Sequence, residues 1–408
     1  MQNQTTLKRS LSLPLVVLYG LGTTIGAGIY ALLGEVARNA GMQSPWAFLI
    51  ASLIASFTAL SFAEMVSRFP RSAGEALYVR KGLGLSQLAT LVGLLVVLAG
   101  CVSSATLING FIGYLAEFVV MPPDLVILLL GLSLGLLAAW GIAESVLLAA
   151  VFTLLEIGGL LLVIWSAREG FGEIPAQLPH LMPGWDPAAW YGIFGASLLA
   201  FYAFLGFEDM VNVAEEVKNV RRVLPLGIIL TLLITALLYV FLSLSAVLTV
   251  PPHELGSSQA PLSLVYERNT GRSSTAISSI ALFAIINGAL IQLIMASRVL
   301  YGLANQASLP AALAYVHPRT RTPLLATALV TALIIPLALW FPLAKLAEST
   351  SIITLIIFTL VNLALWRLKG QAPAPAGVWS VPRWIPTCGF FSSLGLLLFG
   401  LWHLLGSA

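Results

Sequence analysis

Two stretches of the chain place glycines and polar residues inside otherwise apolar sequence. Residues 20–30 read GLGTTIGAGIY, and residues 201–209 read FYAFLGFED. Glycine destabilises a helix interior by about 1 kcal/mol, and an acid at the centre of a bilayer costs about 2.5–3.5 kcal/mol or more. Both anomalies are explained if a membrane helix unwinds in each stretch and lines a cavity. Such breaks offer free carbonyls to an ammonium and free amides to a carboxylate, the two groups of an amino acid.

Each stretch also has a simpler interpretation. Gly26 and Gly28 are small residues of the kind that pack between membrane helices. Glu208 and Asp209 need no cavity if the helix ends before them and an acid caps the next one. The two breaks are favoured because the stretches fall in corresponding positions of two halves of the chain.

The composition identifies an integral membrane protein. Of 408 residues, 59% are hydrophobic and 9% are charged, whereas soluble domains have about 45–50% and about 25%. This excludes a cytoplasmic enzyme, a nucleic-acid binder and a disordered protein. Cys101 and Cys388 lie in apolar segments and the four histidines are scattered, so no disulfide framework, metal site or cofactor is indicated.

A bilayer requires about 20 mostly apolar residues per helix, and the sequence predicts about eleven such transmembrane helices in an all-α fold. The predicted segments are 13–34, 45–66, 85–117, 124–140, 146–166, 190–214, 224–249, 276–303, 323–340, 348–367 and 386–406. Fifteen of the twenty lysines and arginines then fall on one side, which predicts that residues 1–12 are cytoplasmic and that the C-terminus lies outside.

The two unusual stretches lie in the first and the sixth segment. Because the two segments are five positions apart and five is odd, residues 190–367 would repeat the arrangement of residues 13–166 upside down, with 386–406 as an additional helix. Interrupted helices in corresponding positions of two inverted halves point to the binding site of a transporter.

Several motifs resemble the amino acid–polyamine–organocation transporter superfamily. The first is GTTIGAGIY at 22–30, and the others follow in order along roughly residues 8–370: AEMVSRFPRSAGE at 63–75, AEEVKNVRRVLP at 214–225, ASRVLY at 296–301 and VHPRTRTP at 316–323. The resemblance implies a five-plus-five inverted-repeat core with discontinuous helices 1 and 6, and transport of amino acids by alternating access. The final segment matches less well.

The resemblance also implies which groups bind the substrate. Its carboxylate would meet the amides of Ala27 and Gly28, its amine would meet carbonyls near Thr24, Tyr202 and Leu205, and Tyr202 would form an aromatic lid. The substrate-binding residues expected in this way are Thr24, Ile25, Gly26, Ala27, Gly28, Tyr202, Phe204, Leu205 and Gly206. Polar residues of the third and eighth segments would shape the side-chain pocket, unless they bond neighbouring backbone: Ser103, Ser104, Asn109, Asn287 and Gln292.

Glu156 is the first candidate for the coupling residue. The resemblance places it where many proton-coupled members carry a lysine, so the lysine mechanism does not transfer. A buried carboxyl can take up and release a proton, but Glu156 could instead recognise a cationic substrate, ligate sodium or remain protonated against the first segment. Glu208 is the second candidate proton carrier, and Asp209 is a candidate helix cap.

The charged loops at 68–75 and 215–222 are expected on the cytoplasmic side. They are either solvated charges that set the orientation of the protein in the membrane, or partners in ion pairs that close an inner gate. Glu64 would contribute to the gate or to the orientation.

The leading hypothesis is therefore a proton-coupled amino-acid permease in the cell (inner or plasma) membrane, a monomer or homodimer within the lipid bilayer. The alternatives are an exchanger, a carrier of polyamines or cationic amino acids, sodium coupling, or a non-transporting sensor.

Overall fold

The computed structural model describes residues 11–71, 74–140, 146–306 and 308–406, which form helices throughout, with one isolated bridge between Leu11 and Val217. The predicted N-terminal segment 1–12 lies almost entirely outside the described residues. The helices before residue 170 are α1 (Leu13–Ile25), α2 (Ala27–Ala40), α3 (Ser44–Arg68), α4 (Gly74–Leu83), α5 (Ser86–Ala116), α6 (Pro123–Trp140) and α7 (Val146–Ser166).

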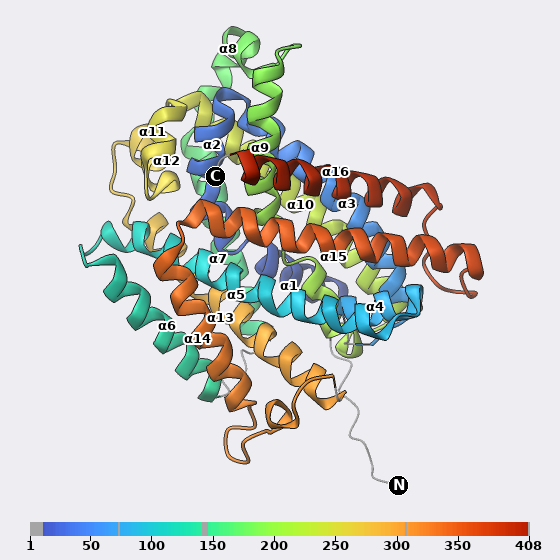
Figure 1. Cartoon of the computed structure of the whole chain (residues 1–408). Helices are drawn as coiled ribbons and strands as arrows, with labels where there is room; N and C mark the ends of the chain where they lie inside the picture. Colours follow the sequence, from blue (N-terminus) through green and yellow to red (C-terminus); the bar gives the residue numbers. More distant parts are fainter. Residues whose placement is uncertain (1–10, 72–73, 141–145, 307, 407–408) are drawn as a thin grey trace.

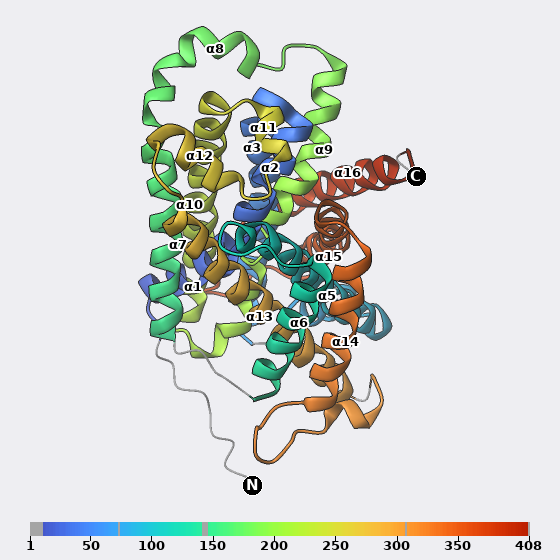
Figure 2. The ribbon, with the colours of Figure 1, turned by 90° about the vertical axis from the view of Figure 1, so that its left-hand side faces the viewer.

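The later helices are α8 (Ile174–Leu181), α9 (Pro187–Ala203), α10 (Val220–Thr249), α11 (Pro252–Ser257), α12 (Pro261–Thr270), α13 (Thr275–Asn305), α14 (Leu324–Trp340), α15 (Leu343–Gln371) and α16 (Trp384–Gly406). Short 3-10 helices are η1 (Gly41–Gln43), η2 (Arg168–Glu173), η3 (Glu208–Glu216) and η4 (Ala311–Ala314). Figure 1 shows α15 and α16 lying side by side, and Figure 2 shows α8 at one end of the molecule, between α7 and α9.

The prediction of an all-α multi-pass membrane protein is confirmed, and each of the eleven predicted segments coincides with a helix or a broken helix. Within the described residues, eight helices are long and apolar enough to cross a bilayer, or nine if the bent pair Ala150–Ser166 and Arg168–Leu181 is one span. Leu13–Ile25 and Leu324–Trp340 are apolar but shorter. The number eleven therefore stays a prediction.

Both predicted interruptions are present. The first segment divides at Gly26, whose φ of −32° and ψ of −136° are not helical, into α1 and α2. The sixth segment ends as α9 at Ala203 and continues, after a turn, as η3. Gly206 in this turn has a φ of +120°, a conformation that is essentially restricted to glycine.

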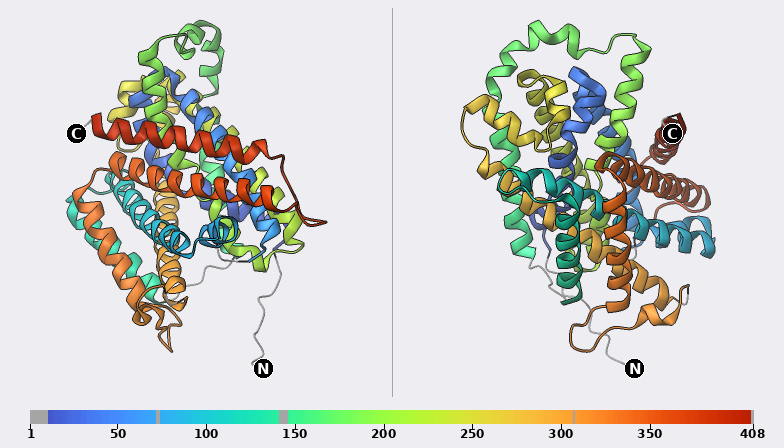
Figure 3. Two further views of the ribbon diagram at one scale, coloured as in Figure 1. Left: turned by 45° about the vertical axis from the view of Figure 1, so that its right-hand side comes forward. Right: turned by 60° about the vertical axis from the view of Figure 1, so that its left-hand side comes forward.

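The helices of the two halves pack in matching pairs. α1 packs on α10 and on α7, and in the second half α9 packs on α3 and on α15. The third segment lies against the eighth, as α5 and α13, and the fourth against the ninth, as α6 and α14 (Figure 3). This arrangement brings both broken helices to the centre of the bundle, because α2 also packs directly on α9.

Glu64 ties together one end of the bundle. Its carboxylate is fully buried and accepts hydrogen bonds from Arg68 Nε and Nη2, from Lys369 Nζ at 2.8 and 2.9 Å, and from the Val381 amide at 2.8 Å. It therefore joins α3 to the end of α15 and to the segment before α16.

Hydrogen bonds tie the second loop expected at an inner gate, 215–222, to α3 and to the start of the described chain. The Ser67 hydroxyl at the end of α3 donates to the Arg221 carbonyl at 3.1 Å, and the backbone of Leu11 pairs with that of Glu216 and Lys218. Arg68 forms its ion pair with Glu64 on its own helix, so the described contacts of Arg68 do not include the ion pair with the second loop that the sequence suggested.

Candidate functional site

The two broken helices interlock at their interruptions. The Thr23 hydroxyl lies 3.0 Å from the Gly206 carbonyl oxygen, to which it donates. A Cβ atom on Gly206 would lie 2.2 Å from the Thr23 carbonyl oxygen, and one on Gly28 would lie 3.0 Å from Ala203 Cα. Glycine is needed at these positions because the two backbones touch, with no space left for a side chain.

Tyr239 on α10 connects both interruptions and was not predicted from the sequence. Its buried hydroxyl lies 3.0 Å from the Thr24 carbonyl oxygen and 3.1 Å from that of Ala203, at the ends of α1 and α9. These carbonyls belong to the last turns of their helices and lack intrahelical partners. The only signal in the sequence is a tyrosine in the middle of an apolar helix.

Replacing Tyr239 by phenylalanine should therefore destabilise the interrupted region. The ring is retained and two buried carbonyls lose their donor, which costs about 1–3 kcal/mol. We expect a lower melting temperature of the purified protein and weaker substrate binding. The control Tyr191→Phe alters an exposed residue whose hydroxyl makes no hydrogen bond within the described structure; equal effects of both substitutions would contradict the role of Tyr239.

The structure places the residues expected to bind the substrate around these ends. Ile25 is the last residue of α1, and α2 starts at Ala27, so the amides of its first turn, including that of Gly28, have no partner within the helix. Two of the three expected carbonyls already accept a hydrogen bond: that of Tyr202 from the Leu205 amide at 3.1 Å, and that of Thr24 from the Tyr239 hydroxyl at 3.0 Å.

Two aromatic residues of the second interruption have different surroundings. The Tyr202 hydroxyl lies 2.9 Å from Ser103 Oγ, so this side chain bridges α9 and α5. Phe204 is fully buried and its ring lies 5.1 Å from that of Tyr239, so its side chain contributes to packing. The position of Tyr202 is compatible with the expected lid, which stays a prediction.

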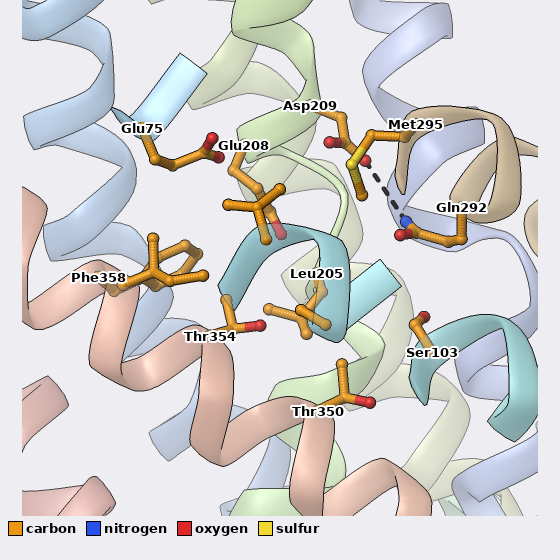
Figure 4. A pocket seen from close by; sticks show the side chains of 13 residues that line it. Glu75, Ser103, Leu205, Glu208, Asp209, Gln292, Met295, Thr350, Thr354 and Phe358 are labelled. Atoms are coloured by element: carbon orange, nitrogen blue, oxygen red, sulfur yellow. Dashed lines mark hydrogen bonds between the residues drawn. The ribbon is translucent and has the colours of Figure 1, made fainter. Parts of the chain in front are cut away.

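A small cavity of about 30 Å³ adjoins the second interruption. Its walls come from α4, α5, the turn after α9, the start of η3, α13 and α15. Its polar lining consists of Glu75, Ser103, Glu208, Asp209, Gln292, Thr350 and Thr354 (Figure 4). This volume holds one or two water molecules, so a whole amino acid requires the walls to move apart.

Only some of the predicted pocket residues line this cavity. Ser103 and Gln292 do. Ser104 instead donates to the Ala289 carbonyl at 3.0 Å, and Asn109 donates to the Ala338 and Phe341 carbonyls at 3.1 and 3.0 Å. These two side chains join neighbouring helices, and Asn287 on α13 is not part of the cavity lining.

Three acids converge on the cavity, and Glu75 was not predicted among them. The Glu208 carboxylate accepts the Gly206 amide at 2.8 Å, which holds the turn. The suggestion that Asp209 caps a helix is wrong, because η3 begins one residue earlier with Phe207 as its cap, and Asp209 accepts Gln292 Nε2 at 3.4 Å. Glu75 is 6% exposed and enters from α4, outside the predicted spans.

Burial, together with the negative charge of Asp209, raises the pKa of Glu75 from 4.5 to about 7. The folded protein then binds more protons than the unfolded chain between these pH values, so its stability falls as the pH rises through this window, by up to about 3 kcal/mol. We expect the melting temperature to decrease from pH 5 to pH 8 and the decrease to be smaller in Glu75→Gln. Glu169→Gln, at an exposed side chain, should keep the original slope; an unchanged slope in Glu75→Gln would contradict this assignment.

Glu156 occupies a separate buried position on α7. Its side chain is 3% exposed, and its backbone carbonyl accepts the Tyr30 hydroxyl of α2 at 2.9 Å. Its carboxylate is within electrostatic range of Tyr239. It therefore lies on a helix that packs on α1, and it is not part of the lining of the acid-lined cavity.

Two interrupted helices that meet beside an acid-lined cavity in a multi-pass bundle define a membrane transporter. The chain matches the amino acid permease family over residues 11–404 and belongs to this family, which confirms the resemblance of its motifs. The family contains permeases and transporters rather than enzymes, as the names of the relatives below also indicate.

The chain is 31% identical to the vacuolar cationic amino acid transporter 4 of Arabidopsis thaliana over 90% of its own length and 64% of that protein. It is 29% identical to the branched-chain amino acid permease BcaP of Bacillus subtilis, over 91% of this chain and 83% of that permease. It is 28% identical to the methylthioribose transporter of the same organism, over 98% of this chain and 89% of that transporter. The chain thus spans less than two thirds of the Arabidopsis cationic transporters that it matches.

Proposed function

We propose that this protein is a secondary active transporter that moves amino acids across a membrane by alternating access. The observation that carries the proposal is the contact between the two interruptions, at Thr23 and Gly206, next to a buried polar cavity. The free amides at the start of α2 can bind a carboxylate. The carbonyls at the ends of α1 and α9 already accept one hydrogen bond each, and their second lone pair can accept an ammonium. Relatives named as amino acid permeases and transporters support the same substrate class.

The proposal includes two inverted repeats, residues 13–166 and 190–367, followed by an additional helix at 386–406. The matching helix pairs support it, since each contact of α1 with α7 or α10 has a counterpart made by α9 with α15 or α3. In alternating access, one repeat moves against the other around the binding site. The interlocked glycines Gly28 and Gly206 would be the points that stay in contact.

Protons are the proposed coupling ion, with Glu156 as carrier and Glu208 as the second candidate. The Glu208 carboxylate accepts the Gly206 amide within the second interruption, and Glu156 is on α7, which packs on the first half-helix α1, so movement of these half-helices would change the access of water to both residues. Sodium coupling and exchange of internal for external amino acids are the competing mechanisms. We further propose the cell membrane as location, with a cytoplasmic N-terminus and an external C-terminus, because this orientation follows the distribution of basic residues.

The test is uptake of a labelled amino-acid mixture into proteoliposomes, with and without an inward proton gradient. Accumulation that requires the proton gradient supports symport, whereas uptake that requires internal amino acid and ignores the gradient identifies an exchanger. A sodium gradient in place of the proton gradient separates the two ions. Binding of amino acids without any uptake would contradict transport and identify a sensor.

A further inference from the structure

A row of hydroxyl groups runs along α10. Four fully buried residues that carry a hydroxyl occupy every fourth position of this helix and so share one side of it: Thr231, Thr235, Tyr239 and Ser243. The hydroxyls of all but Tyr239 have no hydrogen-bond partner in the described structure. Ser245, on the same helix, instead donates to the Phe241 carbonyl at 2.6 Å, one turn back, as such hydroxyls commonly do in a helix. The row therefore leaves the carbonyls of its own helix unused.

The first part of the row faces α1. A Cβ atom on Gly20 would lie 2.5 Å from the Thr231 hydroxyl oxygen, and one on Gly227 would lie 2.6 Å from Val16 Cγ1. The two helices thus advance together, four residues of α1 for four of α10, which places Thr24 level with the second threonine of the row. The Thr24 hydroxyl is also buried and has no partner in the described structure. We call this group of three unpaired hydroxyls the threonine seam: Thr24, Thr231 and Thr235.

The threonine seam is unfavourable while α1 and α10 are in contact. Buried polar groups nearly always have hydrogen-bond partners, and a group without one loses the free energy of its hydration. The three hydroxyl oxygens are inaccessible to water in this arrangement. Separation of the two helices would hydrate them. Because neighbouring hydroxyls of the row are about 6 Å apart along the helix axis, one water molecule between them can bond to both.

The threonine seam connects one end of the bundle with the interruptions. α1 and α10 both begin at the end where the loop 215–222 lies, since the start of the described chain pairs with that loop. At the other end of the seam, Tyr239 donates to carbonyls of both broken helices. Glu156 is on α7, which packs on α1 and on α10, and its carboxyl is within electrostatic range of Tyr239 and of Tyr30 on α2. The seam therefore ends next to the proposed proton carrier.

We propose that the threonine seam opens to water during the transport cycle and forms the path by which a proton passes between Glu156 and the side of the membrane on which the loop 215–222 lies. A hydroxyl can accept one hydrogen bond and donate another. Each threonine that receives a proton from one water molecule passes its own to the next and is restored, and the proton ends on the Glu156 carboxylate. Only O–H bonds are made and broken. The inference rests on the proposed proton-coupled transport and assigns three further residues to it.

The first experiment compares two activities of the reconstituted full-length protein: accumulation driven by an inward proton gradient, and exchange of labelled for unlabelled amino acid without a gradient. Thr231→Val and Thr235→Val keep the shape of the side chain and remove the hydroxyl. In each variant we expect accumulation to slow at least tenfold and exchange to stay within twofold. The melting temperature should stay the same or rise, because an unpaired buried hydroxyl is removed.

Two further variants control for packing. Thr235→Ser keeps the hydroxyl and should accumulate amino acid at the unmodified rate. Thr359→Val is the matched control for loss of a buried threonine hydroxyl, because that hydroxyl donates to the Leu355 carbonyl of its own helix α15 at 2.7 Å. It should change neither activity.

The second experiment detects water in the threonine seam directly. Thr235→Cys is introduced into a protein in which the free cysteines Cys101 and Cys388 are replaced by alanine, and a small charged methanethiosulfonate reagent is added. We expect labelling at least fivefold faster while amino acid is being exchanged than in its absence. Thr359→Cys in the same background should stay unlabelled in both conditions.

The outcomes separate this inference from the proposed function. Accumulation at the unmodified rate in Thr231→Val and Thr235→Val would overturn the path, and so would an equal loss of accumulation and exchange, since the hydroxyls would then serve helix movement. Absence of labelling in Thr235→Cys, in a protein that accumulates amino acid, would overturn the path and leave the proposed function standing. If the unmodified protein only exchanges amino acids, proton coupling and the path fail together while amino-acid transport stands; if it does neither, the proposed function fails as well.

Discussion

Replacing Gly206 by alanine should abolish uptake while the protein still inserts into the membrane. A φ of +120° is strained for any other residue, at a cost of about 1–3 kcal/mol, and the added Cβ would lie 2.2 Å from the Thr23 carbonyl oxygen and 2.5 Å from its carbon. Both clashing atoms belong to backbone, so no side chain can rotate away. The two interruptions must separate, and the Thr23–Gly206 hydrogen bond is lost.

The measurement is amino-acid uptake by proteoliposomes, normalised to the amount of inserted protein. We expect a reduction of about a hundredfold, since 1.4 kcal/mol corresponds to a factor of ten and the backbone clash adds to the strain. Gly302→Ala is the matched control, because a Cβ at this position on α13 meets no atom within 4 Å. Normal uptake by Gly206→Ala would show that the contact between the interruptions is dispensable.

Glutamine at position 156 should eliminate accumulation driven by a proton gradient. Glutamine has nearly the shape of glutamate but carries no exchangeable acidic proton, and the hydrogen bond from Tyr30 is kept because it uses the backbone carbonyl. We expect the internal concentration of amino acid to reach only the external one in Glu156→Gln, while exchange of labelled for unlabelled amino acid continues.

The comparison is made at several external pH values, with Glu169→Gln as control because that side chain is 91% exposed. The control should accumulate amino acid as the unmodified protein does. An unchanged pH profile in Glu156→Gln would mean that Glu156 has a structural role, and the same experiment with Glu208→Gln would then test the second carrier.

The local features of the fold could be predicted from the sequence because they depend on residues close together in the chain. The apolar lengths predict the helices within a few residues: 85–117 was expected and Ser86–Ala116 is found. The interruptions at Gly26 and Gly206 follow from glycines next to polar residues inside apolar runs, since both are unfavourable in a continuous membrane helix.

The composition of the site depends on contacts that local sequence does not specify. Ser103 and Ser104 are adjacent and chemically equal, yet one meets Tyr202 and the cavity and the other bonds Ala289. The orientation of α5 about its axis decides between them, and this orientation is set by packing against α13 and α15. The capping role suggested for Asp209 is wrong because η3 begins at Glu208 with Phe207 as its cap, and the Asp209 side chain instead accepts a hydrogen bond from Gln292 on α13.

The sequence by itself therefore determined the class of protein, the approximate helices and the two points at which they break, because hydrophobic length and glycine strain act locally. Only the tertiary structure revealed that Tyr239 joins both breaks and that Glu75, Asp209 and Thr354 line one cavity. Glu75 and Thr354 are separated by about two thirds of the chain. The charge of Glu75 and the hydroxyl of Thr354 can act on one cavity only after the helices have packed and excluded water around them.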